Sequence, residues 1–219
     1  MSSPQRNLRS SSPDRAEAAF EWLQDHSREA FWAGVAVIVL AGGVWFYRLS
    51  QQAQARNASA ALDDAEAAIA SQNIPLAQSD LEKMTRRYAG TTAGKVGLVL
   101  LAQVHYQKGE YQQGVDALKP LTSANDKYFT PGALSLAAAG MEQMKNYPQA
   151  AALFQQASEK SQFESDRAVN LSAAARNLLA AGKVAEAKAL YTKLAADPEG
   201  FGSAEARVRL GELTAKPAS

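Results

Sequence analysis

Residues 98–118 read LVLLAQVHYQKGEYQQGVDAL, and this stretch decides the fold. Apolar residues recur at helical spacing on both sides of the turn at residues 108–110, which predicts two helices joined tightly. Gly109 suits a helix end, because glycine adopts the left-handed conformation that such ends use. Ala102 and Gly114 are small enough to let two antiparallel helices approach closely. The stretch therefore predicts one helical hairpin.

The same hairpin pattern recurs along the chain. Its first small residues are Ala65, Ala102, Ala138 and Ala175, at steps of 37, 36 and 37 residues. Four further columns keep this register: a second set of small residues (Ala77, Gly114, Ala150, Ala187), large apolar residues (Leu81, Leu118, Phe154, Tyr191), turn residues (Gln72, Gly109, Lys145, Gly182) and further apolar positions (Ala61, Leu98, Leu134, Leu171). Beyond the last repeat, residues 202–216 place apolar residues at helical spacing and predict a capping helix.

These columns resemble the tetratricopeptide repeat family, whose repeats have small residues at their eighth and twentieth positions and an aromatic residue at the seventeenth. Tyr111 and Tyr147 match the aromatic position, whereas Ile74 and Val184 replace it in the outer repeats. The early tryptophan of the family is absent. The resemblance covers about residues 58–199. It implies an all-α solenoid of about four degenerate tetratricopeptide-like repeats, followed by the C-terminal capping helix.

A second feature precedes the repeats: residues 30–47 read AFWAGVAVIVLAGGVWFY and contain no charge. As a helix this stretch would be about 27 Å long, close to the thickness of a hydrocarbon core. Trp32 and Trp45 stand near its ends, where aromatic rings favour the headgroup level. We therefore predict a single transmembrane helix at residues 30–48. A cleavable signal peptide ending near Ala55 and a buried core helix are the less favoured alternatives.

The predicted orientation rests on basic residues near the span. Four arginines precede it and two follow it: Arg6, Arg9, Arg15 and Arg28, then Arg48 and Arg56. This bias predicts a cytoplasmic N-terminus and repeats outside the cytoplasm. The predicted domains are a disordered cytoplasmic tail (1–13), a juxtamembrane helix (14–29), the transmembrane helix (30–48) and the repeat domain (49–216). No glycine or proline lies between Gly43 and Pro75, so we expect one unbroken helix from about residue 30 to 71.

Composition narrows the possible chemistry. The chain has no cysteine, 23 basic and 22 acidic residues, and two histidines. Thiol chemistry and cysteine-based metal sites are excluded, and a formal charge of +1 does not favour nucleic-acid binding. Residues 90–95 (GTTAGK) imitate a phosphate-binding loop but have the wrong spacing, so we interpret them as an inter-repeat loop. We predict no enzyme, no cofactor and no metal site.

Function is then expected at a surface. In tetratricopeptide solenoids, to which these repeats are similar, the first helices of successive hairpins line a groove. On the columns above, that groove would present Leu62, Glu66, Gln103, Tyr106, Gln107, Glu142, Gln143, Arg176 and Leu179. Its mixed polar character suits a peptide or a partner protein. A groove covered by the chain itself or by another copy remains an alternative.

The order of acidic N-terminal helix, span and alanine-rich repeats is similar to the ancillary subunit family of the bacterial Sec translocon, the YfgM-like proteins. Phe20-Glu21-Trp22-Leu23 and residues 206–213 carry that resemblance. It implies a scaffold anchored in the bacterial inner membrane, with periplasmic repeats that hold chaperones or exported clients beside a translocon or envelope-assembly machine. The alternative function is a structural accessory subunit of a large membrane complex.

Overall fold

The computed structural model describes residues 27–215, and all regular elements in this range are α-helices. They are α2 (Ser27–Ala70), α3 (Ile74–Tyr88), α4 (Thr92–Gln107), α5 (Tyr111–Thr122), α6 (Thr130–Gln143), α7 (Tyr147–Lys160), α8 (Glu164–Ala180), α9 (Val184–Ala195) and α10 (Ser203–Thr214). The chain divides into two compact units, residues 1–53 and 54–219. Helix α2 contributes to both units without a break, as the lack of glycine and proline predicted.

The predicted transmembrane helix at residues 30–48 is wrong. Of the helices within residues 27–215, none is both long enough and apolar enough to cross a membrane. The prediction counted residues without charge, whereas a spanning helix depends on residues such as leucine, isoleucine, phenylalanine and valine, whose transfer into hydrocarbon is favourable. Gly42, Gly43 and Trp45 are uncharged but do not belong to that class. The single-pass location in a bacterial inner membrane, with periplasmic repeats, rested on this segment and is wrong with it.

Two other predictions concern the N-terminal residues. The tail at 1–13 lies outside the described residues, and so does the juxtamembrane helix at 14–29, apart from its last three residues, which belong to α2.

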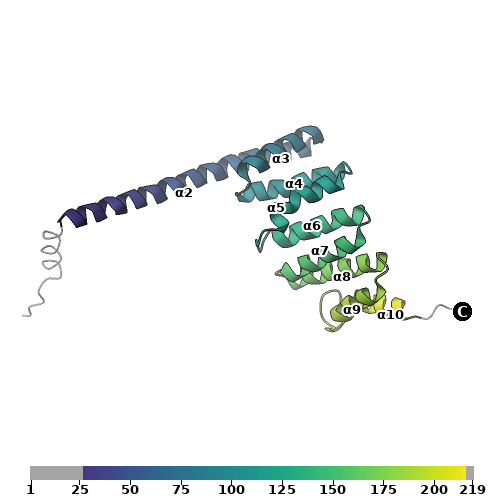
Figure 1. Ribbon diagram of the computed structural model, residues 1–219. Coiled ribbons are helices and arrows are strands. Elements are labelled where there is room, and N and C mark those ends of the chain that lie inside the picture. Colours follow the sequence, from purple (N-terminus) through teal and green to yellow (C-terminus); the bar gives the residue numbers. More distant parts are fainter. Residues whose placement is uncertain (1–26, 216–219) are drawn as a thin grey trace, which may run out of the picture. The chain divides into compact units, whose positions relative to one another are not determined.

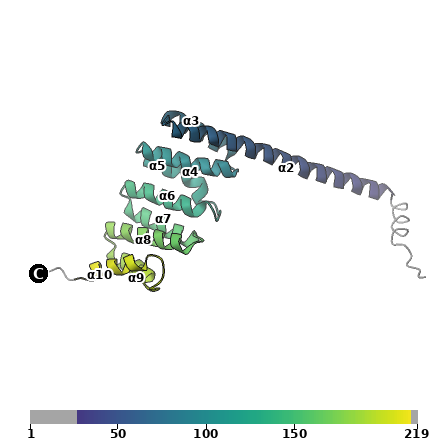
Figure 2. The same ribbon diagram turned by 180° about the vertical axis from the view of Figure 1, so that it is seen from behind.

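The second unit is a stack of helical hairpins (Figures 1 and 2). The end of α2 pairs with α3, α4 with α5, α6 with α7 and α8 with α9, and α10 packs on α9. Each second helix also contacts the first helix of the next hairpin, as α5 does with α6 and α7 with α8. Apolar surface is therefore buried both within and between hairpins, which is how a helical solenoid forms a continuous core.

The columns found in the sequence form this core. Ala65, Ala102, Ala138 and Ala175 are each 0% exposed at the crossings of paired helices. The large apolar column (Leu81, Leu118, Phe154, Tyr191) is buried throughout, and so is the second small column. Small side chains bring the helix axes together, and the large residue one turn later fills the space that remains. The predicted repeat register is confirmed.

The four hairpin turns share one backbone geometry. Gln72, Gly109, Lys145 and Gly182 all have φ between 59° and 76°, in the left-handed region. In the second hairpin, the N–H of Gly109 donates to the carbonyl oxygen of Tyr106 (3.0 Å), and the N–H of Glu110 donates to that of His105 (2.9 Å). The other three turns repeat both hydrogen bonds. These two hydrogen bonds pair carbonyl groups at the helix end, and the chain reverses its direction within three residues.

The capping helix is also where the sequence places it. Ala206 of α10 is fully buried against Tyr191 and Leu194, and Leu210 and Leu213 pack on the same cluster. Charged residues of α10, including Glu205 and Arg207, are exposed. The helix therefore covers the last hairpin with its apolar face and turns its polar face to solvent.

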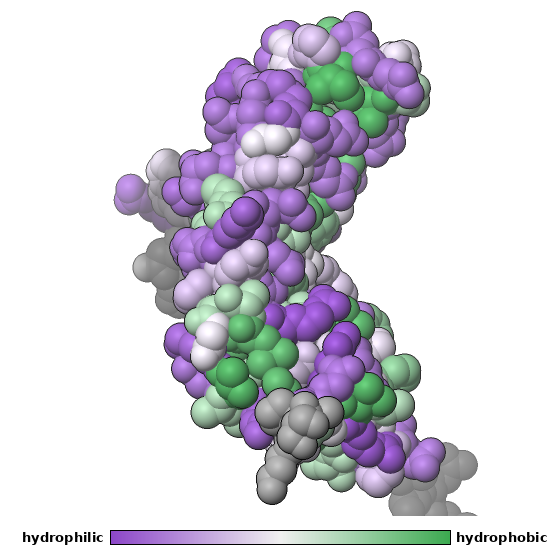
Figure 3. Space-filling view, turned by 90° about the vertical axis from the view of Figure 1, so that its right-hand side faces the viewer, coloured by the Kyte–Doolittle hydropathy of each residue, from purple (hydrophilic) through white to green (hydrophobic). Residues whose placement is uncertain are grey.

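The side of this unit that carries the hairpin turns is mostly hydrophilic (Figure 3). Its hydrophobic patches lie apart, with hydrophilic residues between them (Figure 3). Leu76 and Val184, each near the start of a second helix, are among the exposed apolar residues of the chain. Scattered apolar residues of this kind are normal on protein surfaces. The turn side therefore offers no continuous apolar surface.

Candidate functional site

The first helices of the hairpins form a surface of their own, which we call the first-helix face: residues 54–70 of α2 together with α4, α6 and α8. Direct hydrogen bonds join α4 to α6 and α6 to α8. The Tyr106 hydroxyl of α4 donates to the carbonyl oxygen of Leu136 in α6 at 3.0 Å. The Ser135 hydroxyl of α6 lies 2.6 Å from Oδ1 of Asn170 in α8. These contacts hold neighbouring hairpins in register.

All nine predicted groove residues lie on these first helices. The exposed ones are Glu66, Gln103, Gln107, Gln143 and Arg176. The half-buried ones are Leu62, Tyr106, Glu142 and Leu179. Leu62 and Leu179 pack against the apolar core clusters, so part of each side chain stabilises the fold.

Tyr106 is the predicted groove residue that contributes most to the packing of the fold. Its ring lies against Gly114 of α5 and Gly140 of α6, and a Cβ at either glycine would collide with it. Burial raises the pKa of its hydroxyl to about 12. The hydroxyl already donates to Leu136, so Tyr106 acts first as a wedge between two hairpins.

A pocket of about 450 Å³ opens between α4 and α6. We call it the α4–α6 pocket. Helix α4 contributes Val99 and Gln103, and the loop before α6 contributes Tyr128 and Phe129. Helix α6 itself contributes Gly132, Ala133, Ser135, Leu136 and Ala139. Of the nine predicted residues, only Gln103 lines this pocket. Tyr128 and Phe129 lie in a loop that the repeat columns do not include, and the six other lining residues lie on α4 and α6 outside both the columns and the nine predicted positions.

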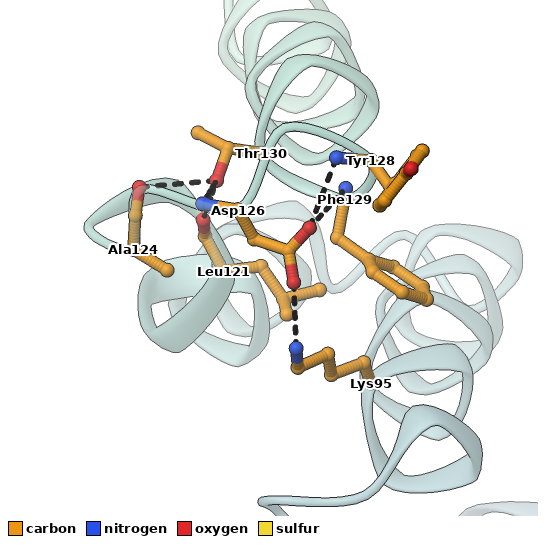
Figure 4. Close-up of polar contacts among 7 residues, drawn as sticks. All are labelled: Lys95, Leu121, Ala124, Asp126, Tyr128, Phe129 and Thr130. Atoms are coloured by element: carbon orange, nitrogen blue, oxygen red, sulfur yellow. Dashed lines mark hydrogen bonds and ion pairs between the residues drawn. The ribbon is translucent and has the colours of Figure 1, made fainter. Parts of the chain in front are cut away.

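The loop that carries Tyr128 is held by Asp126 (Figure 4). One carboxylate oxygen of Asp126, Oδ2, pairs with Nζ of Lys95 at 2.6 Å. The other, Oδ1, accepts hydrogen bonds from the backbone N–H of Tyr128 (2.9 Å) and of Phe129 (3.2 Å). Nζ of Lys95 also lies 5.5 Å from the centre of the Phe129 ring. We call this set of contacts the Asp126 clasp. It joins the start of α4 to the loop before α6.

Thr130 closes the other side of the same loop (Figure 4). Its buried hydroxyl lies 3.0 Å from the carbonyl oxygens of both Leu121 and Ala124, and it accepts a hydrogen bond from the backbone N–H of Asp126 at 3.1 Å. The hydrogen bonds of Thr130 thus fix the ends of the loop, and the Asp126 clasp fixes its centre. An aspartate two residues before paired aromatics was the sequence signal that could have revealed it.

We expect Asp126→Asn to increase hydrogen exchange in residues 123–129 while α5 stays protected. The hydrogen bond from Lys95, with those from the backbone N–H groups of Tyr128 and Phe129, holds the pKa of Asp126 below its usual value. A carboxyl whose pKa is lowered by folding stabilises the fold above its unfolded pKa, near 4, and loses that effect as pH falls through its folded pKa.

Acid should therefore reproduce the Asn variant. Exchange measured by mass spectrometry, corrected for intrinsic rates, should differ between wild type and variant at pH 7. The difference should shrink as the pH falls below about 4 and disappear below the folded pKa of Asp126. Equal protection of the loop at pH 7 would show that the clasp does not order it.

A comparison with protein families matches residues 20–215 to the tetratricopeptide repeat-like domain. The chain belongs to this family. A comparison with curated proteins gave no match. The family assignment agrees with the hairpin register and the left-handed turns. Tetratricopeptide-like repeats are typically non-catalytic scaffolds that bind other proteins. The family match covers the tetratricopeptide resemblance, whereas the resemblance to ancillary translocon subunits is not confirmed by it.

Proposed function

We propose that the first-helix face binds a protein partner and that the chain works as an interaction scaffold. The observation that carries this proposal is the α4–α6 pocket, which opens on that face beside exposed Gln103. Gln103, Gln107 and Gln143 offer both donors and acceptors, which suits contacts with a partner's backbone. Arg176 adds a cation on α8 that can pair with a carboxylate.

The partner class that we propose is a chaperone or the client protein that it accompanies. Support comes from the part of the resemblance to ancillary translocon subunits that does not depend on a span, namely the alanine-rich repeats and residues 206–213, together with the mixed polar and apolar character of the first-helix face. The alternative is an accessory subunit in which the solenoid braces a larger complex. The two differ in stoichiometry, because a brace stays bound in fixed ratio, whereas a client exchanges.

A charge-reversal pair of variants tests the proposal. The face variant combines Gln103→Glu, Gln143→Glu and Arg176→Glu, all exposed residues of first helices. The matched control combines Gln113→Glu, Gln156→Glu and Lys160→Glu, exposed residues of second helices. Both variants lower the formal net charge by the same amount, so a difference in binding between them does not arise from net charge.

We expect the amount of partner protein bound to the immobilised face variant to fall at least about tenfold relative to wild type, while the control binds as much as wild type. Quantitative mass spectrometry of the bound proteins measures this amount. Equal capture by both variants would overturn a role for the first-helix face. Separation of the captured proteins by size would then distinguish a fixed-ratio complex from an exchanging client.

A further inference from the structure

A second pocket, of about 280 Å³, lies between the second helices α7 and α9, beside the first half of α8. We call it the α7–α9 pocket. None of the nine predicted groove residues is among its described lining residues. The apolar part of the lining consists of Ala168, Leu171, Leu190 and Leu194 from the helices and Phe201 from the loop before α10. Phe201 is 60% exposed, so it offers an aromatic surface at the opening.

Charged side chains of both signs line the same pocket. They are the cations Arg167 and Lys193 and the carboxylates Glu159, Glu164 and Asp197. Within residues 27–215 none of these five side chains forms an ion pair. The corresponding groove between α5 and α7 has one charged residue in its described lining, Lys119, which pairs with Asp116 at 2.7 Å. A rim of charges that lack protein partners is therefore not a general property of the grooves between second helices.

Arg167 is held in place by the backbone at the end of α7. Its Nη1 donates hydrogen bonds to the carbonyl oxygens of Ser161 and Gln162, each at 3.2 Å. A guanidinium group has five N–H donors, so its Nε and Nη2 can still bind a carboxylate with two parallel hydrogen bonds. The pocket thus contains a cation whose position is set before any ligand arrives.

The loop that carries Phe201 is also fixed. The carbonyl oxygen of Pro198 accepts hydrogen bonds from Oγ of Ser203 at 2.9 Å and from Nη2 of Arg207 at 2.8 Å. Both donors belong to α10, so the loop is tied to the capping helix. An aromatic side chain on an ordered backbone loses little conformational freedom when a ligand packs against it.

We propose that the α7–α9 pocket binds a free α-amino acid with an apolar side chain, a function separate from the partner binding proposed above. The ligand carboxylate pairs with Arg167 and Lys193, and the ligand ammonium group pairs with the acidic residues of the rim. The ligand side chain gains by burial against the leucines and Phe201. A volume of about 280 Å³ is just below the range of drug-sized ligands and suits a molecule of this size.

Other small ligands fit this lining less well. A ligand with a single charge meets fixed charges of its own sign, from the carboxylates if it is an anion and from Arg167 and Lys193 if it is a cation. An amino acid with a charged side chain would place that charge among leucines, where it loses hydration without gaining a partner. The lining therefore selects a zwitterion with an apolar side chain.

Saturation-transfer nuclear magnetic resonance on the full chain tests the ligand class. We expect leucine, isoleucine, methionine and phenylalanine to bind, and glycine, aspartate and lysine to bind at least about tenfold more weakly. N-acetyl-leucine lacks the ammonium group and leucinamide lacks the carboxylate, so each should also bind at least about tenfold more weakly than leucine. Equal binding of leucine and either analogue would overturn the proposal, and so would the absence of saturable leucine binding below about 10 mM.

Two variants and a matched control place the binding in the pocket. Lys193→Gln and Phe201→Ser alter exposed lining residues, and Lys160→Gln alters an exposed residue of α7 outside the lining. Each pocket variant should weaken leucine binding at least about tenfold, whereas the control should bind as wild type does. Lys193→Gln should not weaken the binding of leucinamide, because that ligand has no carboxylate to lose its partner. Wild-type affinity for leucine in both pocket variants would overturn the assignment of the site.

Discussion

Leu118→Ala is expected to lower the free energy of unfolding by about 2–5 kcal/mol. Leu118 is 0% exposed and packs in one cluster with Leu98, Ala102 and Val115. Truncation removes apolar contacts and leaves a cavity between α4, α5 and α6 that their backbones cannot fully close. Because domains of this kind are stable by only about 5–15 kcal/mol, the variant should unfold at much lower denaturant concentration.

Urea unfolding followed by far-ultraviolet circular dichroism measures this effect. Leu76→Ala is the matched control, because Leu76 is 46% exposed and should change stability by less than about 1 kcal/mol. A reduced slope of the transition in Leu118→Ala would show that the hairpins on either side of α5 unfold separately. Similar midpoints for the two variants would contradict the position of Leu118 in the repeat core.

Much of this fold could be read from spacing alone. A helical hairpin requires small residues at the crossing and a residue tolerant of positive φ at the turn. Both kinds of position recur at the same offsets in each repeat of the sequence. Gln72 and Lys145 show how far the inference extends, since neither is a glycine and both adopt the left-handed conformation that Gly109 predicts. Register thus identified turn positions that residue type alone would have missed.

The transmembrane prediction failed because a local pattern was given more weight than its physical basis. The uncharged stretch at residues 30–47 was read as a span, although freedom from charge does not by itself make a helix apolar enough. Pro120 lies inside α5, two residues before its last residue. A proline this close to the C-terminus interrupts little, because its missing N–H affects only the final turn.

The α4–α6 pocket could not be predicted in the same way. Its shape depends on the loop at residues 123–129, whose position is fixed by the pair between Lys95 and Asp126, 31 residues apart. Such a contact occurs once and has no counterpart in the repeat columns. Periodic reasoning recovers what every hairpin shares, and the pocket is a feature of one hairpin junction.

Gly140→Leu should lower the free energy of unfolding by about 1–3 kcal/mol, although leucine is the better helix former. A Cβ at Gly140 would collide with the Tyr106 side chain and lie within 2.8 Å of Cγ2 of Val115. Neither neighbour can withdraw easily, since Tyr106 is fixed through its hydrogen bond to Leu136 and Val115 is buried. Overpacking at this hairpin junction should therefore outweigh the gain in helix propensity.

Gly132→Leu provides the control within the same helix. The space around Gly132 is open, so this substitution should keep stability or raise it by up to about 1 kcal/mol. Removal of the obstacle should rescue the first variant: Tyr106→Ala with Gly140→Leu should be at least about 1 kcal/mol more stable than the two single effects added together. Additive effects in this cycle, measured by urea unfolding, would mean that Tyr106 does not wedge the second and third hairpins together. Its ring would then be free to serve the first-helix face directly.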